Sequence, residues 1–271
     1  MPEARVGMSG WTYAPWRGEF YPRGLRQADE LRYAAEKVTS IELNGSFYSL
    51  QKPSSWTKWR DETPDGFVFA VKAPRFMTHI RRLQDVEEPL ANFLASGILA
   101  LGPKLGPILW QLPPSLEYDP EVVGRFLDLL PHDTATALEI AKGRSERMSG
   151  REHLEIDANR PVRHALEPRA FSFDDQQFAD QAAEARVAVV LGDNAGRWPR
   201  LDWITADFVY ARLHGDEEIY TSGYDEPSLA EWEEWVRDNL DRDRDVYVYF
   251  DNDQKVRAPY DAMALNERLA R

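Results

Sequence analysis

The feature that most constrains the fold of this chain is a series of eight short apolar segments separated by polar or helical stretches. The segments lie at residues 6–10, 40–44, 67–72, 107–111, 163–167, 188–191, 208–212 and 245–250. Most are rich in Val, Ile, Leu, Phe or Tyr, which is typical of parallel strands buried on both faces. Helical patterns separate most of these strands, at residues 27–38, 53–62, 87–101, from 119 onward, 174–186, 226–240 and 258–269.

Alternating strands and helices allow two architectures, a closed (β/α)₈ barrel or an open doubly wound sheet. The open sheet is disfavoured because "GMSGW", after the first strand, lacks the glycine spacing of a dinucleotide-binding turn. The sequence therefore predicts a single α/β domain over residues 1–271, a (β/α)₈ barrel of TIM type. Two irregularities are expected: a polar excursion at 141–159, and a weak or missing helix within 192–207, between the sixth and seventh strands.

Polar residues follow the apolar part of nearly every predicted strand. In "SIELNGSFY", Glu42 and Asn44 share one face because side chains alternate along a strand. The same position is held on other strands by Lys72, Gln111, Glu167, Arg169, Arg212, His214 and Asp193, and by Asp251 or Asn252 in "YFDND". In a (β/α)₈ barrel the carboxyl ends of all strands meet at one face, where the site lies. The pattern therefore predicts one shared polar mouth.

Composition excludes several classes of site. The chain has no cysteine, hence no disulfide and no thiolate chemistry. Its net charge of −13 argues against broad binding to nucleic acid, because such binding needs a basic surface. A local basic pocket is still compatible with this charge. No signal peptide and no apolar run of membrane-spanning length is visible. A cytoplasmic protein with no membrane partner is expected, and the oligomeric state is left open.

Seven stretches in chain order carry a resemblance to a known family. They are "VGMSGWTYAPWRGEFYP", "SIELNGSFYSLQKPSSWTKW", "FVFAVKAPRFMTHIRRL", "LGPILWQLPP", "ALEPRAFSF", "YARLHG" and "VYVYFDND". On these the sequence resembles the YecE-like family, also called DUF72, whose members form TIM barrels and have no settled activity. The resemblance places the family's recurrent polar positions on Glu42, Asn44, Lys72, His79, Gln111, Glu167, Arg169 and Arg212. It supports the fold but not a reaction.

The residue types at the predicted mouth favour an enzyme that acts on an anionic substrate by general acid/base chemistry. Cations that converge at one site attract phosphate or carboxylate groups. The residues expected to be catalytic are Glu42, Lys72, His79 and Glu167; those expected to bind substrate are Asn44, Tyr48, Gln111, Arg169, Arg212, His214 and Asn252. The substrate is expected to be a small or oligomeric phosphorylated or carboxylated compound, sugar-like or nucleotide-like. Hydrolase, isomerase and lyase chemistry all stay open.

Three other interpretations remain. The pairs Glu42–Lys72 and Glu167–Arg169 would have a purely structural role as buried ion pairs. A metal-dependent phosphodiesterase or nuclease would use carboxylates and His79 or His214 as ligands, but the neighbouring cations oppose a metal ion and no HExxH spacing occurs, so no cofactor is predicted. A non-catalytic protein that binds an anionic metabolite is the third. The basic loop "KAPRFMTHIRRL" is either an ordinary solvated loop or a lid that carries His79.

Overall fold

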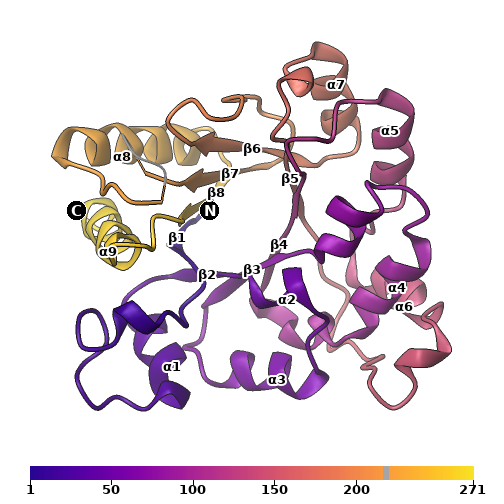
Figure 1. Ribbon diagram of the computed structural model, residues 1–271, viewed down its shortest axis with the longest axis horizontal. Coiled ribbons are helices and arrows are strands. Elements are labelled where there is room, and N and C mark those ends of the chain that lie inside the picture. The colour runs from indigo at the N-terminus through magenta and orange to yellow at the C-terminus, as the bar shows by residue number, and fades with distance from the viewer. Residues whose placement is uncertain (216–219) are drawn as a thin grey trace.

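The computed structural model describes residues 1–215 and 220–271, and a closed barrel of eight parallel strands forms its centre (Figure 1). The strands are β1 (Ala4–Ser9), β2 (Ser40–Leu43), β3 (Val68–Lys72), β4 (Leu105–Gln111), β5 (His164–Glu167), β6 (Ala188–Asp193), β7 (Phe208–Leu213) and β8 (Asp245–Phe250). Each pairs with its neighbour in chain order, and β8 pairs with β1. The predicted barrel is confirmed.

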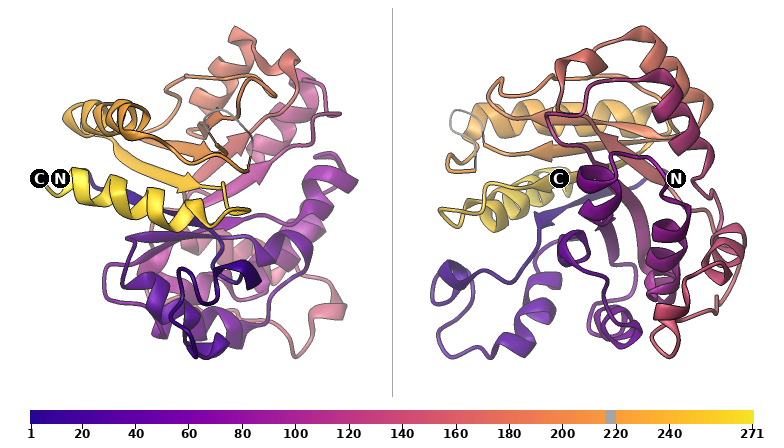
Figure 2. Two further views of the ribbon diagram at one scale, coloured as in Figure 1. Left: turned by 60° about the vertical axis from the view of Figure 1, so that its left-hand side comes forward. Right: turned by 45° about the vertical axis from the view of Figure 1, so that its right-hand side comes forward.

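Helices surround this barrel (Figures 1 and 2). They are α1 (Glu30–Ala35), α2 (Gly45–Tyr48), α3 (Pro53–Asp61), α4 (Glu87–Ala95), α5 (Pro120–Asp128), α6 (Thr134–Lys142), α7 (Gln176–Glu184), α8 (Glu226–Asp241) and α9 (Arg257–Leu269). The last two lie side by side against β8, and α9 also contacts β1 (Figure 1). This docking helps to close the seam between the two ends of the chain.

Aspartates set the start of several helices. Asp119, Asp133, Asp175 and Asp225 precede α5, α6, α7 and α8, and each carboxylate accepts a hydrogen bond from a backbone N–H in the first turn. These bonds satisfy donors that a helix N-terminus otherwise leaves free. The predicted helix start at Asp119, with its carboxylate as the cap, is therefore confirmed.

Two helix predictions need correction. The single helix expected over 87–101 ends at Ala95, because Gly97 adopts φ 110° and the chain continues as a 3₁₀ helix over Ile98–Lys104. The segment before the polar excursion contains a separate helix, α6, which the sequence analysis did not distinguish. After α6 the excursion holds one short 3₁₀ turn, Glu146–Met148, and no helix lies between β6 and β7. Both expected irregularities are present.

The barrel interior is filled with side chains below its C-terminal end. Val68, Ala70, Leu109, Ala165, Ala188, Val190, Phe208, Tyr210, Tyr247 and Tyr249 form one buried cluster there. The strands also approach one another closely: a Cβ on Gly7 would lie 1.7 Å from the carbonyl oxygen of Ser40. Any cavity at the mouth therefore has a closed floor. In the described part of the chain, no helix has both the length and the apolar character needed to cross a bilayer.

Candidate active site at the C-terminal end of the barrel

The guanidinium of Arg212, on β7, is the centre of the polar end of the barrel. Its side chain is 1% exposed. It reaches three carboxylates from different strands: Glu42 on β2, with Nη2 2.9 Å from Oε1; Glu167 on β5, with Nη1 3.0 Å from Oε2; and Asp251 after β8, with Nη2 3.0 Å from Oδ2. Burial lowers the pKa of Arg212, but these carboxylates outweigh it and hold the pKa well above its ordinary value.

Glu42 is fully buried and is bonded at both of its oxygens. Ser9 Oγ donates to Oε1 over 2.8 Å, Tyr210 Oη donates to Oε2 over 2.7 Å, and Arg212 donates to both. The carboxylate does not line the cavity described below. This position disagrees with the expected role of Glu42 in proton transfer, and Glu42 pairs with Arg212 rather than with Lys72 as the alternative structural interpretation had it. Glu42 instead positions Arg212.

Glu167 is bonded in the same way by three neighbours. Gln111 Nε2 donates to Oε2 over 2.8 Å, Arg169 Nη2 donates to Oε1 over 2.9 Å, and Arg212 donates to both oxygens. Burial would raise the pKa of Glu167, but Arg169, Arg212 and further cations hold it below its ordinary value. Glu167 is therefore an ionised anchor, and the expected Glu167–Arg169 pair is formed.

A cavity of about 670 Å³ opens above these anchors, and its walls differ in charge. The wall that follows β2 to β5 presents Asn44, Lys72, Arg75, His79, Gln111 and Arg169, with the rings of Phe47 and Tyr48. The wall formed by the loops after β1, β7 and β8 presents Tyr13, Tyr220, Asp251, Asp253 and Gln254. The cavity therefore has a cationic side and an acidic side, with Arg212 at its base.

Lys72 is the most unusual group in the cavity. The side chain is buried, at 9% exposure, yet its amine forms no hydrogen bond or ion pair with any described residue. Its Nζ lies 4.3 Å from the centre of the Phe47 ring. Burial and the charge of Arg212 lower the pKa of Lys72 to about 8, although Glu42, Glu167 and Asp251 act in the opposite direction.

His79 lies beside Lys72 on a π-helical turn, Phe76–Ile80. The ring is half-buried, contacts the edge of Phe47 at 5.1 Å between ring centres, and has Nδ1 2.9 Å from Thr78 Oγ1. Burial and the nearby charge of Lys72 lower the pKa of His79 to about 4. His79 is therefore neutral at pH 7, and its ring can relay a proton by accepting it at one nitrogen and donating from the other.

The arginines of the basic loop around His79 have different contacts. Arg75 lines the cavity and forms no ion pair with any described residue. Arg82 instead donates to the backbone of Ser115 over 2.7 Å, and the Arg81 guanidinium lies 5.9 Å from the Phe76 ring centre. Only the first part of the loop faces the mouth.

The remaining predicted residues separate into two groups. Asn44, Tyr48, Gln111 and Arg169 line the cavity; Tyr48 is 74% exposed, and the side-chain oxygen of Asn44 is buried without a hydrogen-bond partner. His214 and Asn252 do not line it.

Those two residues lie behind the cavity wall. His214 is fully buried with Nε2 3.0 Å from Arg212 Nη1, and burial together with Arg212 lowers its pKa to about 4. Asn252 donates to Ser222 O over 2.9 Å and to Asp261 Oδ2 over 2.8 Å. Of the pair Asp251 and Asn252, the aspartate is the one that faces the mouth. The expected contact of His214 and Asn252 with substrate does not fit these positions.

The acidic wall contains residues that the sequence analysis did not assign to the site. Asp253 is half-buried, and burial together with Asp251 raises its pKa. Tyr13 donates to Ser9 O over 2.6 Å, and burial raises its pKa. Both lie on loops beyond strand ends, so strand alternation could not place them. The only available signals were the aromatic cluster around Tyr13 and the acidic ending "YFDND".

Possible metal ligands are not grouped at this site. Among residues 1–215 and 220–271, no set of three or more histidine, aspartate or glutamate side chains is arranged to hold a metal ion. His214 approaches Glu167 and Asp251, at 3.8 and 3.4 Å, but Arg212 lies between them.

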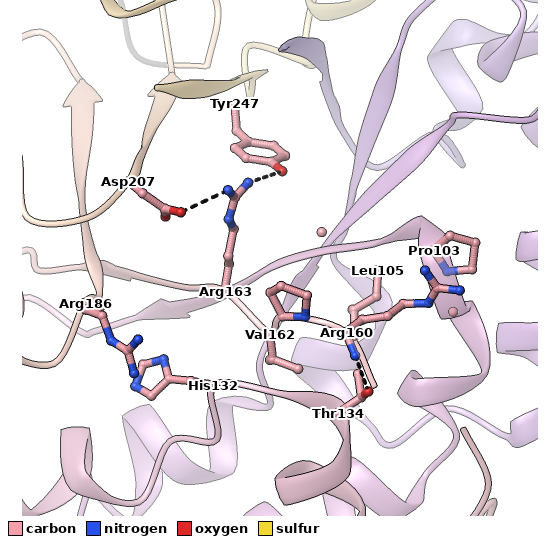
Figure 3. A pocket seen from close by; sticks show the side chains of 13 residues that line it. Pro103, Leu105, His132, Thr134, Arg160, Val162, Arg163, Arg186, Asp207 and Tyr247 are labelled. Carbon is pink, nitrogen blue, oxygen red and sulfur yellow. Dashed lines mark hydrogen bonds and ion pairs between the residues drawn. The ribbon is translucent and has the colours of Figure 1, made fainter. Parts of the chain in front are cut away.

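A second cavity, of about 550 Å³, lies at the N-terminal end of the barrel (Figure 3). Arg163 crosses it and pairs with Asp245 over 2.5 Å and Asp207 over 3.2 Å. Arg186 and His132 face one another on its wall (Figure 3), and burial together with Arg186 lowers the pKa of His132. Its central arginine is already neutralised, so this cavity offers less unpaired charge to an anion than the mouth does.

Comparison with known proteins gives a consistent result. The model of the family described as "Protein of unknown function DUF72" matches residues 5–271. The chain is 27% identical over 185 residues to UPF0759 protein YecE of Escherichia coli K12, and this match covers 64% of the chain and 65% of the relative's length. It is 29% identical over 114 residues to UPF0759 protein YunF of Bacillus subtilis, covering 40% of the chain and 39% of that relative.

A solved structure shows the same fold. The crystal structure of a DUF72 family protein from Thermotoga maritima has a TM-score of 0.77 at 23% identity, covering 99% of this chain and 100% of the other. One from Enterococcus faecalis has a TM-score of 0.73 at 16% identity, covering 99% and 96%.

Proposed function

The chain belongs to the DUF72 family, described as of unknown function, and from the chemistry of its mouth we propose that it is an enzyme acting on a phosphorylated or carboxylated substrate. The anionic group of the substrate binds the cationic wall, and its hydroxyl or amino groups meet Asp251 and Asp253 on the opposite wall. Proton transfer belongs to groups in the cavity, not to the buried anchors Glu42 and Glu167.

The observation that carries this proposal is the uncompensated charge on one wall. Lys72 and Arg75 form no ion pair with any described residue, and Arg169 keeps its Nη1 without a hydrogen bond there. The Arg169 guanidinium also lies 3.7 Å from the ring centre of Trp198, which fixes its plane. Fixed, partly desolvated cations are the groups that proteins use to bind phosphate and carboxylate.

Titratable groups in the cavity support catalysis in addition to binding. Lys72, with a pKa of about 8, and His79, with a pKa of about 4, lie on one wall, and Asp253, with a raised pKa, lies on the other. Titratable groups with shifted pKa values that share a cavity are typical of active sites.

Calorimetric titration with sulfate tests the binding step, because sulfate keeps its charge across neutral pH. We expect Arg169→Gln to weaken sulfate binding about tenfold, the effect of losing roughly 1.5 kcal/mol of charge-assisted hydrogen bonding. Arg186→Gln, in the cavity at the opposite end, is the matched control and should leave the affinity unchanged. The reverse result would place the anion site at the N-terminal end and contradict the proposal.

Turnover is tested next with panels of sugar phosphates, nucleotides and carboxylated sugars. If compounds of these panels compete with sulfate for binding but none is converted, the chain is a binding protein and not an enzyme. The metal-dependent phosphodiesterase alternative predicts bound metal and activity lost to a chelator, so elemental analysis of the purified protein separates it from the present proposal.

A further inference from the structure

The chain contains two buried lysines whose amines have opposite surroundings. Lys72 and Lys104 are each 9% exposed. Lys104 Nζ donates to Arg60 O, Thr63 O and Thr63 Oγ1 over 2.6, 2.7 and 3.1 Å, which uses all three of its N–H groups. Lys72 Nζ has no such partner among the described residues and faces the cavity. One amine is structural, and the other is available for chemistry.

We propose that Lys72 is a nucleophile that forms an imine with the carbonyl carbon of an aldehyde or ketone bearing a phosphate or carboxylate group. This inference rests on the proposed function, because the anionic group is what brings the carbonyl to Lys72. It names the substrate class, and it gives the enzyme a covalent step.

The surroundings of Lys72 increase the fraction of its amine that is deprotonated near pH 7. An amine is nucleophilic only when deprotonated, and a desolvated lysine beside another cation is a recurrent way to reach that state near pH 7. Lys72 is buried, and both Arg212 and Arg169 share its cavity. With a pKa of about 8, about a tenth of the amine is deprotonated at pH 7, against less than a thousandth for a solvated lysine.

The cavity also allows the carbonyl carbon of an anionic substrate to lie beside the amine of Lys72. Arg75 and Arg169 lie on the same wall as Lys72, so an anion bound there holds its attached carbonyl carbon beside the amine. The Phe47 ring covers Lys72 from one side at 4.3 Å and leaves the cavity side as its accessible direction. The volume of about 670 Å³ accommodates a compound of sugar-phosphate size.

The step balances without an oxidant or reductant. The lone pair of Nζ attacks the carbonyl carbon, and the C=O π electrons move to oxygen, which gains a proton while nitrogen loses one. The hydroxyl then leaves as water after a second protonation, and nitrogen supplies the electron pair of the C=N bond. One neutral amine, one carbonyl and one proton give one iminium ion and one water. The carboxyl of Asp253, whose pKa is raised, and the neutral His79 line the same cavity as the donor and the relay for that proton.

Reductive trapping on the whole protein tests the proposal. Two matched pairs of probes are incubated with sodium borohydride: glyceraldehyde 3-phosphate against glyceraldehyde, and pyruvate against acetone. Borohydride delivers hydride to an imine carbon and fixes the adduct as a secondary amine, which peptide mapping locates among the seven lysines. We expect labelling of Lys72 by at least one anionic probe, at least tenfold above Lys104 and above the matched neutral probe.

Variants separate this inference from the proposed function. Lys72→Arg should abolish the adduct and keep sulfate affinity within about twofold, because it keeps the charge and loses the nucleophile. Lys72→Gln should abolish the adduct and weaken sulfate binding as well, and thermal melting checks that both variants fold. Sulfate binding without any Lys72 adduct overturns the imine and leaves the proposed function standing. Absence of both, or equal labelling by anionic and neutral probes, overturns both.

Discussion

Arg212 and Glu42 form a two-point ion pair across the barrel, with Nη2 2.9 Å from Oε1 and Nε 3.0 Å from Oε2. They come from β7 and β2, which are not neighbours in the sheet, and their side chains are 1% and 0% exposed. The pair therefore spans the interior of the cylinder just beneath the mouth, between strands three positions apart in the sheet. It holds the base of the cavity in place; Arg212 forms part of the cavity lining, whereas Glu42 does not line it.

Removing the charge of Glu42 should destabilise the protein strongly. In Glu42→Gln, Arg212 keeps Glu167 and Asp251 but loses the charge of its two-point partner while still buried, and the loss of a hydrogen bond to a charged group typically costs about 1.5–3 kcal/mol. Urea unfolding measures the change. Arg26→Gln, which breaks the exposed Arg26–Asp29 pair, serves as control and should change stability little. Equal effects of the two substitutions would contradict the structural role assigned to Glu42.

Sulfate affinity should fall as pH rises through about 8. Lys72 is cationic below its pKa of about 8 and neutral above it, so the cavity loses one positive charge over this range. Calorimetry at pH 7 and pH 9.5, at constant ionic strength, should show a several-fold loss of affinity. Lys72→Arg should remove most of this dependence, because arginine stays charged throughout. A flat profile for the unmodified protein would show that Lys72 does not contact the anion.

The indole of Trp198 should matter for anion binding without touching the anion. Arg169 stacks on this ring at 3.7 Å between its guanidinium carbon and the ring centre, and Glu167 holds the edge of the guanidinium. Trp198→Leu should weaken sulfate binding about threefold to tenfold by freeing the arginine, while Trp198→Phe should restore most of the affinity. Trp235→Leu is the control, because Trp235 lies on α8, is partly buried and does not line the cavity. A Phe variant as weak as the Leu variant would argue against stacking.

The burial of His164 should make the free energy of unfolding decrease as pH falls from 6.5 to 4. His164, on β5, is fully buried; its Nδ1 accepts from Trp110 Nε1 and its Nε2 donates to Pro131 O, which requires the neutral ring. Burial lowers its pKa to about 4, so between these pH values the unfolded chain binds a proton that the folded chain does not. Stability is therefore lost as pH falls through this window.

Two measurements check this dependence. Proton NMR of the His164 ring should show the Nε2–H tautomer and no titration above about pH 5. Urea midpoints from pH 6.5 to 4.5 should fall less steeply for His164→Gln than for the unmodified chain; carboxylates with lowered pKa values, such as Glu167, add their own loss only below about 4.5. Titration of His164 near pH 6.5 would contradict the assignment.

The barrel and the location of its polar end follow from the sequence because both depend on local, periodic patterns. Alternation places Lys72, Gln111 and Arg212 on the inner face at the ends of their strands, and all three line the cavity. The break at Gly97 is different: a left-handed glycine ends a helix whose apolar pattern continues beyond it. A periodic pattern does not reveal this.

The partition of roles within the mouth does not follow from the sequence. Glu42 and Lys72 both point into the barrel from adjacent strands, but Glu42 is level with Ala70, so Lys72 lies two residues nearer the mouth. Only the folded structure shows that Arg212, from a distant strand, bonds both oxygens of Glu42. Asp251 and Asn252 lie past the last residue of β8, where alternation no longer applies. Long-range pairing, not residue type, separates an anchor from a reactive group.

The packed interior beneath Arg212 makes the mouth a blind-ended chamber. Tyr210 lies beneath it and donates to Glu42, and the side chains of the buried cluster fill the barrel interior below. For the proposed enzyme, product must leave through the same opening by which substrate enters. Product and substrate then compete for one cavity, and competitive inhibition by product is the expected result in steady-state assays.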